Sequence, residues 1–142
     1  MAEDPYDLQR FIDAQAPIFE QAVAELSAGT KRSHWMWFVF PQIAGLGRSA
    51  TAVRYAIRSL EEARAYLAHP ILGPRLLQVT RILNQVEGRS AHDIFGSPDD
   101  MKLHSSLTLF AQAAPDEPAF RAALDRYFDG HIDRATLERL AS

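Results

Sequence analysis

The residues best suited to chemistry are concentrated in one segment, residues 31–42, which read KRSHWMWFVFPQ. Both tryptophans of the protein, Trp35 and Trp37, lie there, shortly after the cations Lys31 and Arg32. Indole rings often border ligand sites, and lysine and arginine bind anionic groups through charge-assisted hydrogen bonds. The segment therefore predicts a site for an anionic small molecule, with Trp35 or Trp37 as a stacking wall.

The same side chains also have a structural interpretation. Aromatic rings dominate core packing, and this interpretation applies most strongly to Phe38 and Phe40. Lys31 and Arg32 are then solvated cations beyond a helix C-terminus, where the helix dipole favours positive charge. The residue types leave both interpretations open.

A glycine-spaced loop, GLGRS at residues 45–49, follows Gln42 and precedes a predicted helix. Glycines let a backbone approach a ligand closely, and the N–H groups at a helix start attract anions. The spacing matches neither a Walker loop nor a dinucleotide fingerprint, and no βαβ context surrounds it. We expect Gln42 and Arg48 to contribute to the same anion site.

A second polar group, formed by Lys102, Ser105 and Ser106, lies in KLHSSLTLF at residues 102–110. On a helix these three side chains project within one turn of each other. A Ser–Lys nucleophile is one interpretation, whereas binding of the anionic ligand by all three is another. In the structural alternative, the hydroxyls let helices approach closely and bond the carbonyl four residues back.

Two histidines, His34 and His69, are the candidates for general acid–base catalysis, because histidine alone has an unperturbed pKa near neutrality. The reaction would then be a hydrolysis or a glycosyl transfer. A hydrogen-bonded structural role is the alternative for His34. The other histidines are scattered, and neither an HExxH motif nor an EF-hand loop is present, so we expect no metal site.

Composition narrows the class of protein. A chain of 142 residues suits one domain, 1–142, and 47% hydrophobic with 23% charged residues is ordinary for a globular protein. The net charge of −3 argues against nucleic acid as a partner. The absence of cysteine excludes disulfides and a cysteine nucleophile, and we expect no cofactor.

The acidic N-terminus lacks a signal-peptide core, and no apolar run approaches about 18 residues, so we expect a cytoplasmic protein without a membrane span.

The elements that must position these residues are helices. Apolar spacing and cap residues predict them at 5–12, 17–26, 50–57, 59–68, 71–86, 97–110, 118–128 and 133–140, with a capped turn at 90–96. The β-like run 35–40 has no partner strand, so it is predicted to cross the core as a short helix or an extended segment. The fold class is all-α, with about six to eight helices in an orthogonal or irregular bundle.

Several motifs together resemble the DUF1810 family. They are DLQRF at 7–11, AQ at 14–15, SHWMWF at 33–38, FPQ at 40–42, GLGRS at 45–49, AYLAHP at 65–70, LGPRL at 72–76, IFG at 94–96 and KLHSSLTLF at 102–110. The resemblance implies a single-domain, mainly helical fold, and it brings no established activity or catalytic residues. Members are sometimes labelled calpastatin, but calpain inhibition works through disordered segments, whereas this composition is that of a packed domain.

The leading hypothesis is that the polar and cationic motif residues converge on one pocket beside the tryptophans. These residues are His34, Gln42, Arg48, His69, Arg75, Lys102, Ser105 and Ser106. The ligand would be a nucleotide or an ADP-ribose-like metabolite. The alternative is a non-enzymatic interaction or structural module in which the aromatic run is core. RNA binding would require a contiguous basic and aromatic surface. The oligomeric state is not predicted.

Overall fold

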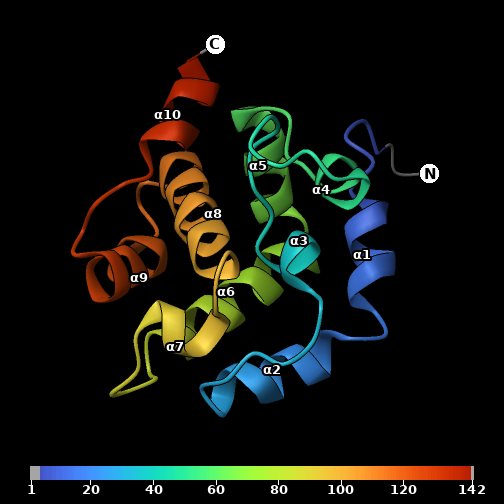
Figure 1. Cartoon of the computed structure of the whole chain (residues 1–142). Helices are drawn as coiled ribbons and strands as arrows, with labels where there is room; N and C mark the ends of the chain where they lie inside the picture. The colour runs from blue at the N-terminus through green and yellow to red at the C-terminus, as the bar shows by residue number, and fades with distance from the viewer. Residues whose placement is uncertain (1–3, 142) are drawn as a thin grey trace.

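The computed structural model describes residues 4–141, in which ten helices and one isolated β-bridge, between Ile43 and Ile57, are found (Figure 1). The helices are α1 (Gln9–Gln15), α2 (Phe19–Ser27), α3 (Met36–Val39), α4 (Ala50–Arg54), α5 (Leu60–Ala68), α6 (Leu72–Leu83), α7 (Ala91–Phe95), α8 (Asp99–Ala113), α9 (Pro118–Phe128) and α10 (Arg134–Ala141). The all-α class is confirmed. The helix number exceeds six to eight because α3, α4 and α7 have only four or five residues each.

Helix α8 is the centre of the fold. It packs against α5, α7, α9 and α10, which surround it in Figure 1. Nine of its 15 residues are buried, so apolar and small polar side chains occupy all of its faces. The hydroxyls of Ser105 and Thr108 bond the carbonyls of Met101 and His104, each four residues back, as the structural alternative predicts.

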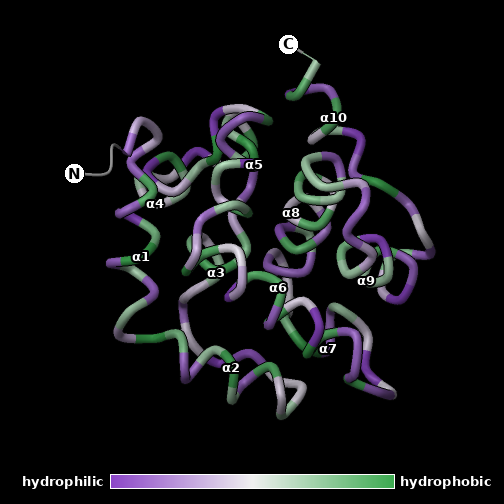
Figure 2. Tube along the Cα trace, turned by 180° about the vertical axis from the view of Figure 1, so that it is seen from behind, coloured by the Kyte–Doolittle hydropathy of each residue, from purple (hydrophilic) through white to green (hydrophobic). Residues whose placement is uncertain are grey.

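The hydropathy pattern of several other helices shows that each has one apolar face (Figure 2). Hydrophobic and hydrophilic residues alternate along α2, α6 and α9 in Figure 2, as expected for helices with one apolar face. Helix α6 follows α5 after a tight turn, which brings Gly73 in the first turn of α6 against the carbonyl of Leu67. A Cβ at Gly73 would come within 2.0 Å of that oxygen, so this turn requires a glycine.

The aromatic run crosses the core as predicted, with helix α3 at its centre. Trp35, Met36, Val39 and Phe40 are buried, whereas Trp37 and Phe38 are half-buried. The rings of Trp35 and Phe40 lie 6.3 Å apart between centroids. The structural interpretation therefore holds for Phe40, and it extends to Trp35.

Serine caps fix several helix starts. Ser90 and Asp93 form a complete capping box at α7. At α5 the Ser59 hydroxyl accepts from the N–H of Glu62, but the Glu62 carboxylate turns away to Arg10 and to the backbone N–H of Arg58. The predicted start of this helix is confirmed, although Glu62 does not complete a capping box with Ser59.

Replacing Ser90 by alanine should lower the free energy of unfolding by about 1 kcal/mol, because the N–H of Asp93 loses its acceptor. Urea denaturation measures the change. Ser27→Ala is the matched control, since Ser27 is exposed at the end of α2, and it should change stability by less than about 0.5 kcal/mol. Equal effects of the two substitutions would contradict the capping role.

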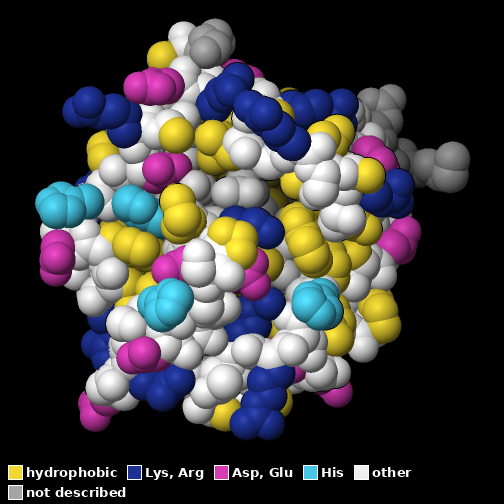
Figure 3. Space-filling view, in the orientation of Figure 1, with side chains coloured by type: hydrophobic (Ala, Val, Ile, Leu, Met, Phe, Trp, Pro, Cys, Tyr) yellow, Lys and Arg dark blue, Asp and Glu magenta, His cyan; other side chains and the backbone are white. Residues whose placement is uncertain are grey.

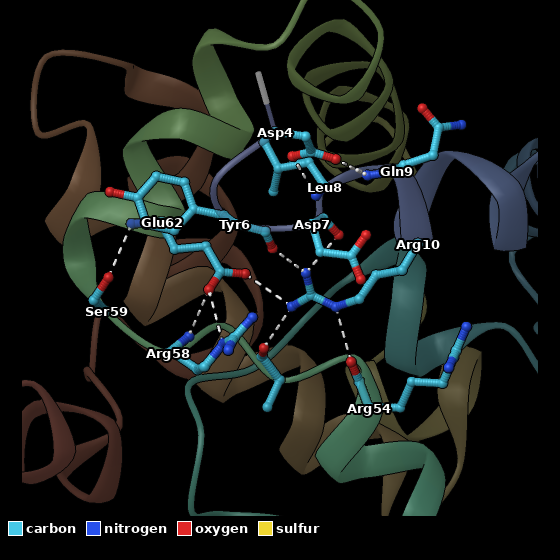
Figure 4. A network of polar contacts seen from close by, with 11 residues as sticks. Asp4, Tyr6, Asp7, Leu8, Gln9, Arg10, Arg54, Arg58, Ser59 and Glu62 are labelled. Carbon is cyan, nitrogen blue, oxygen red and sulfur yellow. Dashed lines mark hydrogen bonds and ion pairs between the residues drawn. The ribbon is translucent and has the colours of Figure 1, made fainter. Parts of the chain in front are cut away.

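A buried ion pair between Arg10 and Glu62 ties α1 to α5. The Arg10 guanidinium lies 2.8 Å from Oε2 of Glu62, and it also donates to four backbone carbonyls (Figure 4). These carbonyls belong to Tyr6, Asp7, Arg54 and Ala56. The network fixes the chain on both sides of residues 55–57, which border the site described below.

Candidate functional site

Two adjoining cavities lie between α3, the loop at residues 42–47 and α8. The inner cavity has a volume of about 10 Å³, which is room for about one water molecule. It is lined by Met36, Trp37, Phe40, Gln42, Ile43, Gly47, Ala52, Tyr55, Ala56 and Lys102. The outer groove has a volume of about 330 Å³ and is lined by Gln42, Leu46, Gly47, Pro98, Met101, Lys102, His104, Ser105, Asp133 and Ala135. Gln42, Gly47 and Lys102 line both, so the inner cavity adjoins the outer groove at these residues.

Lys102 is the charged side chain at this junction. Its Nζ lies 4.8 Å from the centroid of the Trp37 ring and 3.6 Å from Oδ1 of Asp99. The other oxygen of Asp99 lies 2.7 Å from Nζ of Lys31, which in turn lies 5.1 Å from the Trp35 ring centroid. Two ammonium groups thus share one carboxylate, and each also lies over an indole face. The cluster carries a net charge of +1.

The glycines of the loop are explained by close packing. A Cβ at Gly47 would lie 2.5 Å from the Cβ of Ala52. Gly45 has φ +99°, and a Cβ there would meet the guanidinium of Arg139 at 2.8 Å. These two contacts hold the loop against α4 and α10, and thereby place Gln42 and Leu46 beside α8.

Asp133 is the acidic side chain of the outer groove. Its Oδ2 accepts from the hydroxyls of Ser105 (2.7 Å) and Thr136 (2.6 Å), and its N–H donates to Thr108. One residue before Ser105, His104 has its Nε2 2.7 Å from the carbonyl of His131. On the face over α8 and α3, hydrophobic side chains lie next to basic and acidic ones (Figure 3).

Trp35 belongs to a structural anchor and does not line either cavity. It is fully buried, and its Nε1 donates to Oε1 of Glu25 at 3.0 Å. The Glu25 carboxylate also accepts from the N–H of Arg32, and from both the N–H and the hydroxyl of Ser33. Burial raises the pKa of Glu25, but the hydrogen bonds from Ser33, Arg32 and Trp35 outweigh it and lower the pKa to about 2.

The structure brings together four of the predicted ligand-binding residues, namely Trp37, Gln42, Lys102 and Ser105, and leaves the others apart. His34, Arg32 and Arg48 are exposed and line neither cavity. Lys31 lines neither cavity, and its 7%-exposed side chain contacts the Asp99 carboxylate that also contacts Lys102. Ser106 is buried, lines neither cavity, and its hydroxyl has no hydrogen-bond partner within residues 4–141.

The remaining two residues of the predicted convergence also lie elsewhere. The Nδ1 of His69 accepts from the N–H groups of Ile71 and Leu72 at the start of α6. Arg75 donates to Oε1 of Gln15 at 3.3 Å. Both contacts hold helices in place, so these side chains stabilise the fold outside the two cavities.

His104 and Asp133 line the outer groove, and Asp99 contacts Lys102, but none of the three is among the residues that the sequence predicts for the site. Asp99 begins α8 and Asp133 directly precedes α10, and a position at a helix start does not show what else a carboxylate contacts. Helical spacing could have identified one further groove residue. Met101 lies four residues before Ser105, and Lys102 lies three residues before it, so all three side chains are neighbours on one face of α8. No group of three or more His, Asp or Glu side chains within residues 4–141 is placed to hold a metal ion.

None of the helices within residues 4–141 has the length and apolarity needed to cross a membrane. The fold and site define a small all-α protein in which a groove opens between the loop after α3 and the central helix α8. The chain belongs to the DUF1810 family, because residues 5–140 match the family described as "Protein of unknown function (DUF1810)". The resemblance drawn from the motifs is thereby confirmed.

Comparison with solved structures agrees with this assignment. The chain is similar to the conserved hypothetical protein Rv1873 from Mycobacterium tuberculosis, known from a crystal structure, with 58% sequence identity and a TM-score of 0.96. The match covers 98% of this chain and 99% of that chain. No curated protein matches the chain significantly.

Proposed function

We propose that the protein binds a small molecule in the outer groove through an anionic group that contacts Lys102. The observation that carries this proposal is the charge at the junction of the two cavities. Among the described residues that line the inner cavity, Lys102 is the only charged one. An anionic group in the outer groove meets the Lys102 ammonium where the groove adjoins the inner cavity, and Asp133, the carboxylate that lines the outer groove, does not line the inner cavity.

The arrangement of Asp99 leaves the charge of Lys102 available. The Asp99 carboxylate lies 2.7 Å from Lys31 and 3.6 Å from Lys102, so its stronger contact is with Lys31. The Lys102 side chain is 23% exposed and can reach a ligand in the groove. Charge-assisted hydrogen bonds to a carboxylate or a phosphate are about twice as strong as neutral ones.

Gln42 supplies a second polar group at the same place. Its side-chain amide has no hydrogen-bond partner within the described residues, although its carbonyl accepts from the N–H of Ile57. An amide next to an ammonium group can donate to the second oxygen of an anion. Trp37 and Tyr55 form the aromatic wall behind these two groups.

The size of the groove favours a small ligand. A volume of 330 Å³ lies at the lower end of the usual range for ligand sites and holds about ten non-hydrogen atoms. This volume supports a small carboxylate or phosphate better than an intact ADP-ribose-like molecule. The alternative, a non-enzymatic interaction or structural module, accounts for the burial of Trp35 and Phe40. It gives no role to Lys102 at the boundary of the two cavities.

The proposal is tested by titrating 3-phenylpropanoate into the protein by calorimetry. We expect a Kd on the order of 0.1–1 mM, as suits a ligand of this size. Lys102→Met should weaken binding by about 10-fold or more, since it removes a charge-assisted hydrogen bond.

Arg48→Ala is the matched control for this experiment. Arg48 is an exposed cation directly after Gly47, but it lines neither cavity, so its removal should leave the affinity unchanged. Loss of binding in Arg48→Ala with full binding in Lys102→Met would contradict the proposed site and favour the loop as the anion site.

A further inference from the structure

We infer, building on the proposed function, that the ligand of the outer groove is an amino-acid-like zwitterion with an apolar side chain. Its carboxylate contacts Lys102, and its ammonium group contacts Asp133. Asp133 is then a second recognition site in the groove, which binds a cationic group. The binding of an anion at Lys102 does not by itself require this second site.

The first observation is that the groove carries both charges. Lys102 and Asp133 both line it, but only Lys102 also lines the inner cavity. Asp133 is hydrogen-bonded to Ser105, which follows Lys102 by three residues on α8. Three residues advance a helix by about 4.5 Å, so Lys102 and the serine that holds Asp133 lie about one turn apart along α8.

The second observation is that Asp133 has an open acceptor and no counter-charge. Its Oδ2 is held by the hydroxyls of Ser105 and Thr136, which fix the carboxylate at the start of α10. Its Oδ1 has no hydrogen-bond partner within residues 4–141, and no lysine, arginine or histidine of that range pairs with it. A half-buried carboxylate that is positioned but unpaired is suited to an ammonium group.

The third observation is the apolar wall between these groups and solvent. Leu46, Pro98 and Met101 line the groove, and the Met101 side chain is among the most exposed large hydrophobic ones, at 67%. A thioether side chain adapts to irregular apolar shapes. The groove thus offers Met101 as an apolar surface beside the two charged residues Lys102 and Asp133. This combination suits a ligand whose charged end contacts Lys102 and Asp133 and whose apolar side chain contacts Met101.

The test compares three ligands that share one apolar group: phenylalanine, 3-phenylpropanoate and 2-phenylethylamine. Calorimetry on the wild-type chain should show phenylalanine binding at least about 10-fold more tightly than either single-charge analogue. Asp133→Asn should abolish this advantage and leave the affinity for 3-phenylpropanoate unchanged. Asparagine keeps an oxygen that can accept from the hydroxyls of Ser105 and Thr136, so α10 should keep its start, which the melting temperature verifies.

The outcomes separate this inference from the proposed function. Equal affinities for phenylalanine and 3-phenylpropanoate would overturn the zwitterion and leave the anion site standing. Tightest binding of 2-phenylethylamine, or an unchanged preference in Asp133→Asn, would also overturn it. If none of the three ligands binds the wild-type chain, both the inference and the proposed function fail.

Discussion

Replacing Arg10 by methionine should destabilise the protein by about 3–5 kcal/mol, the largest effect we expect from a single substitution. Glu62 is fully buried, and the Arg10 guanidinium is its closest cation at 2.8 Å. Methionine removes this charge and also leaves the carbonyls of Arg54 and Ala56 without their donor. Thermal unfolding should show a decrease of about 3 °C in Tm for each kcal/mol lost.

The matched control for this experiment is Arg54→Met. Arg54 contributes only its carbonyl to the network, while its own guanidinium is exposed and lies over the Tyr55 ring at 5.6 Å. Its replacement should cost less than about 1 kcal/mol. A loss below 1 kcal/mol in Arg10→Met would contradict the role we assign to the buried pair.

This network also bears on the site. Tyr55 and Ala56 line the inner cavity, and the carbonyls on which Arg10 acts belong to Arg54 and Ala56. Stability of the fold and shape of the cavity therefore depend on the same buried cation. Ligand affinity in Arg10→Met must be measured well below its melting temperature.

Replacing Glu25 by glutamine should cost about 3 kcal/mol near pH 7. The hydrogen bonds at Glu25 hold its folded-state pKa at about 2, below its ordinary value of 4.5. A lowered pKa means that the carboxylate stabilises the fold fully above pH 4.5, and that this contribution is lost as the pH falls toward 2. The gap between wild type and Glu25→Gln should therefore shrink to about 1 kcal/mol at pH 3.

Urea denaturation at pH 7 and pH 3 measures this gap. Glu20→Gln on the same helix is the control, because Glu20 is exposed and its replacement should change stability by less than about 0.5 kcal/mol. A gap that stays constant between the two pH values would show that the Glu25 carboxylate does not titrate as its contacts require.

The longer helices could be predicted because their apolar spacing is local information. The stretches 118–128 and 71–86 correspond to α9 (Pro118–Phe128) and α6 (Leu72–Leu83), the second ending earlier because the chain turns after Leu83. Helices α3 and α7 are too short to show a helical period. They depend on contacts between distant segments, such as the N–H of Lys31 bonding the carbonyl of Ile94.

The site could be predicted only in part, for a related reason. The sequence placed Lys102 and Trp37 among the candidates because their types suit an anion site. It gave Glu25 no role beyond a helix residue, since nothing local shows that the chain returns to bring Ser33 and Trp35 onto that carboxylate. Residue type indicates what a side chain can do, whereas long-range contacts decide whether it is free to do it.

If an anionic group binds at Lys102 beside Trp37, the two indole N–H resonances of the protein should respond differently to it. In an NMR titration with 3-phenylpropanoate, the Trp37 resonance should shift saturably, because the ligand draws Lys102 from the Trp37 face. The Trp35 resonance should stay in place, since its N–H is buried on Glu25. Saturable shifts of resonances on other surfaces, with an unchanged Trp37 resonance, would contradict anion binding at Lys102.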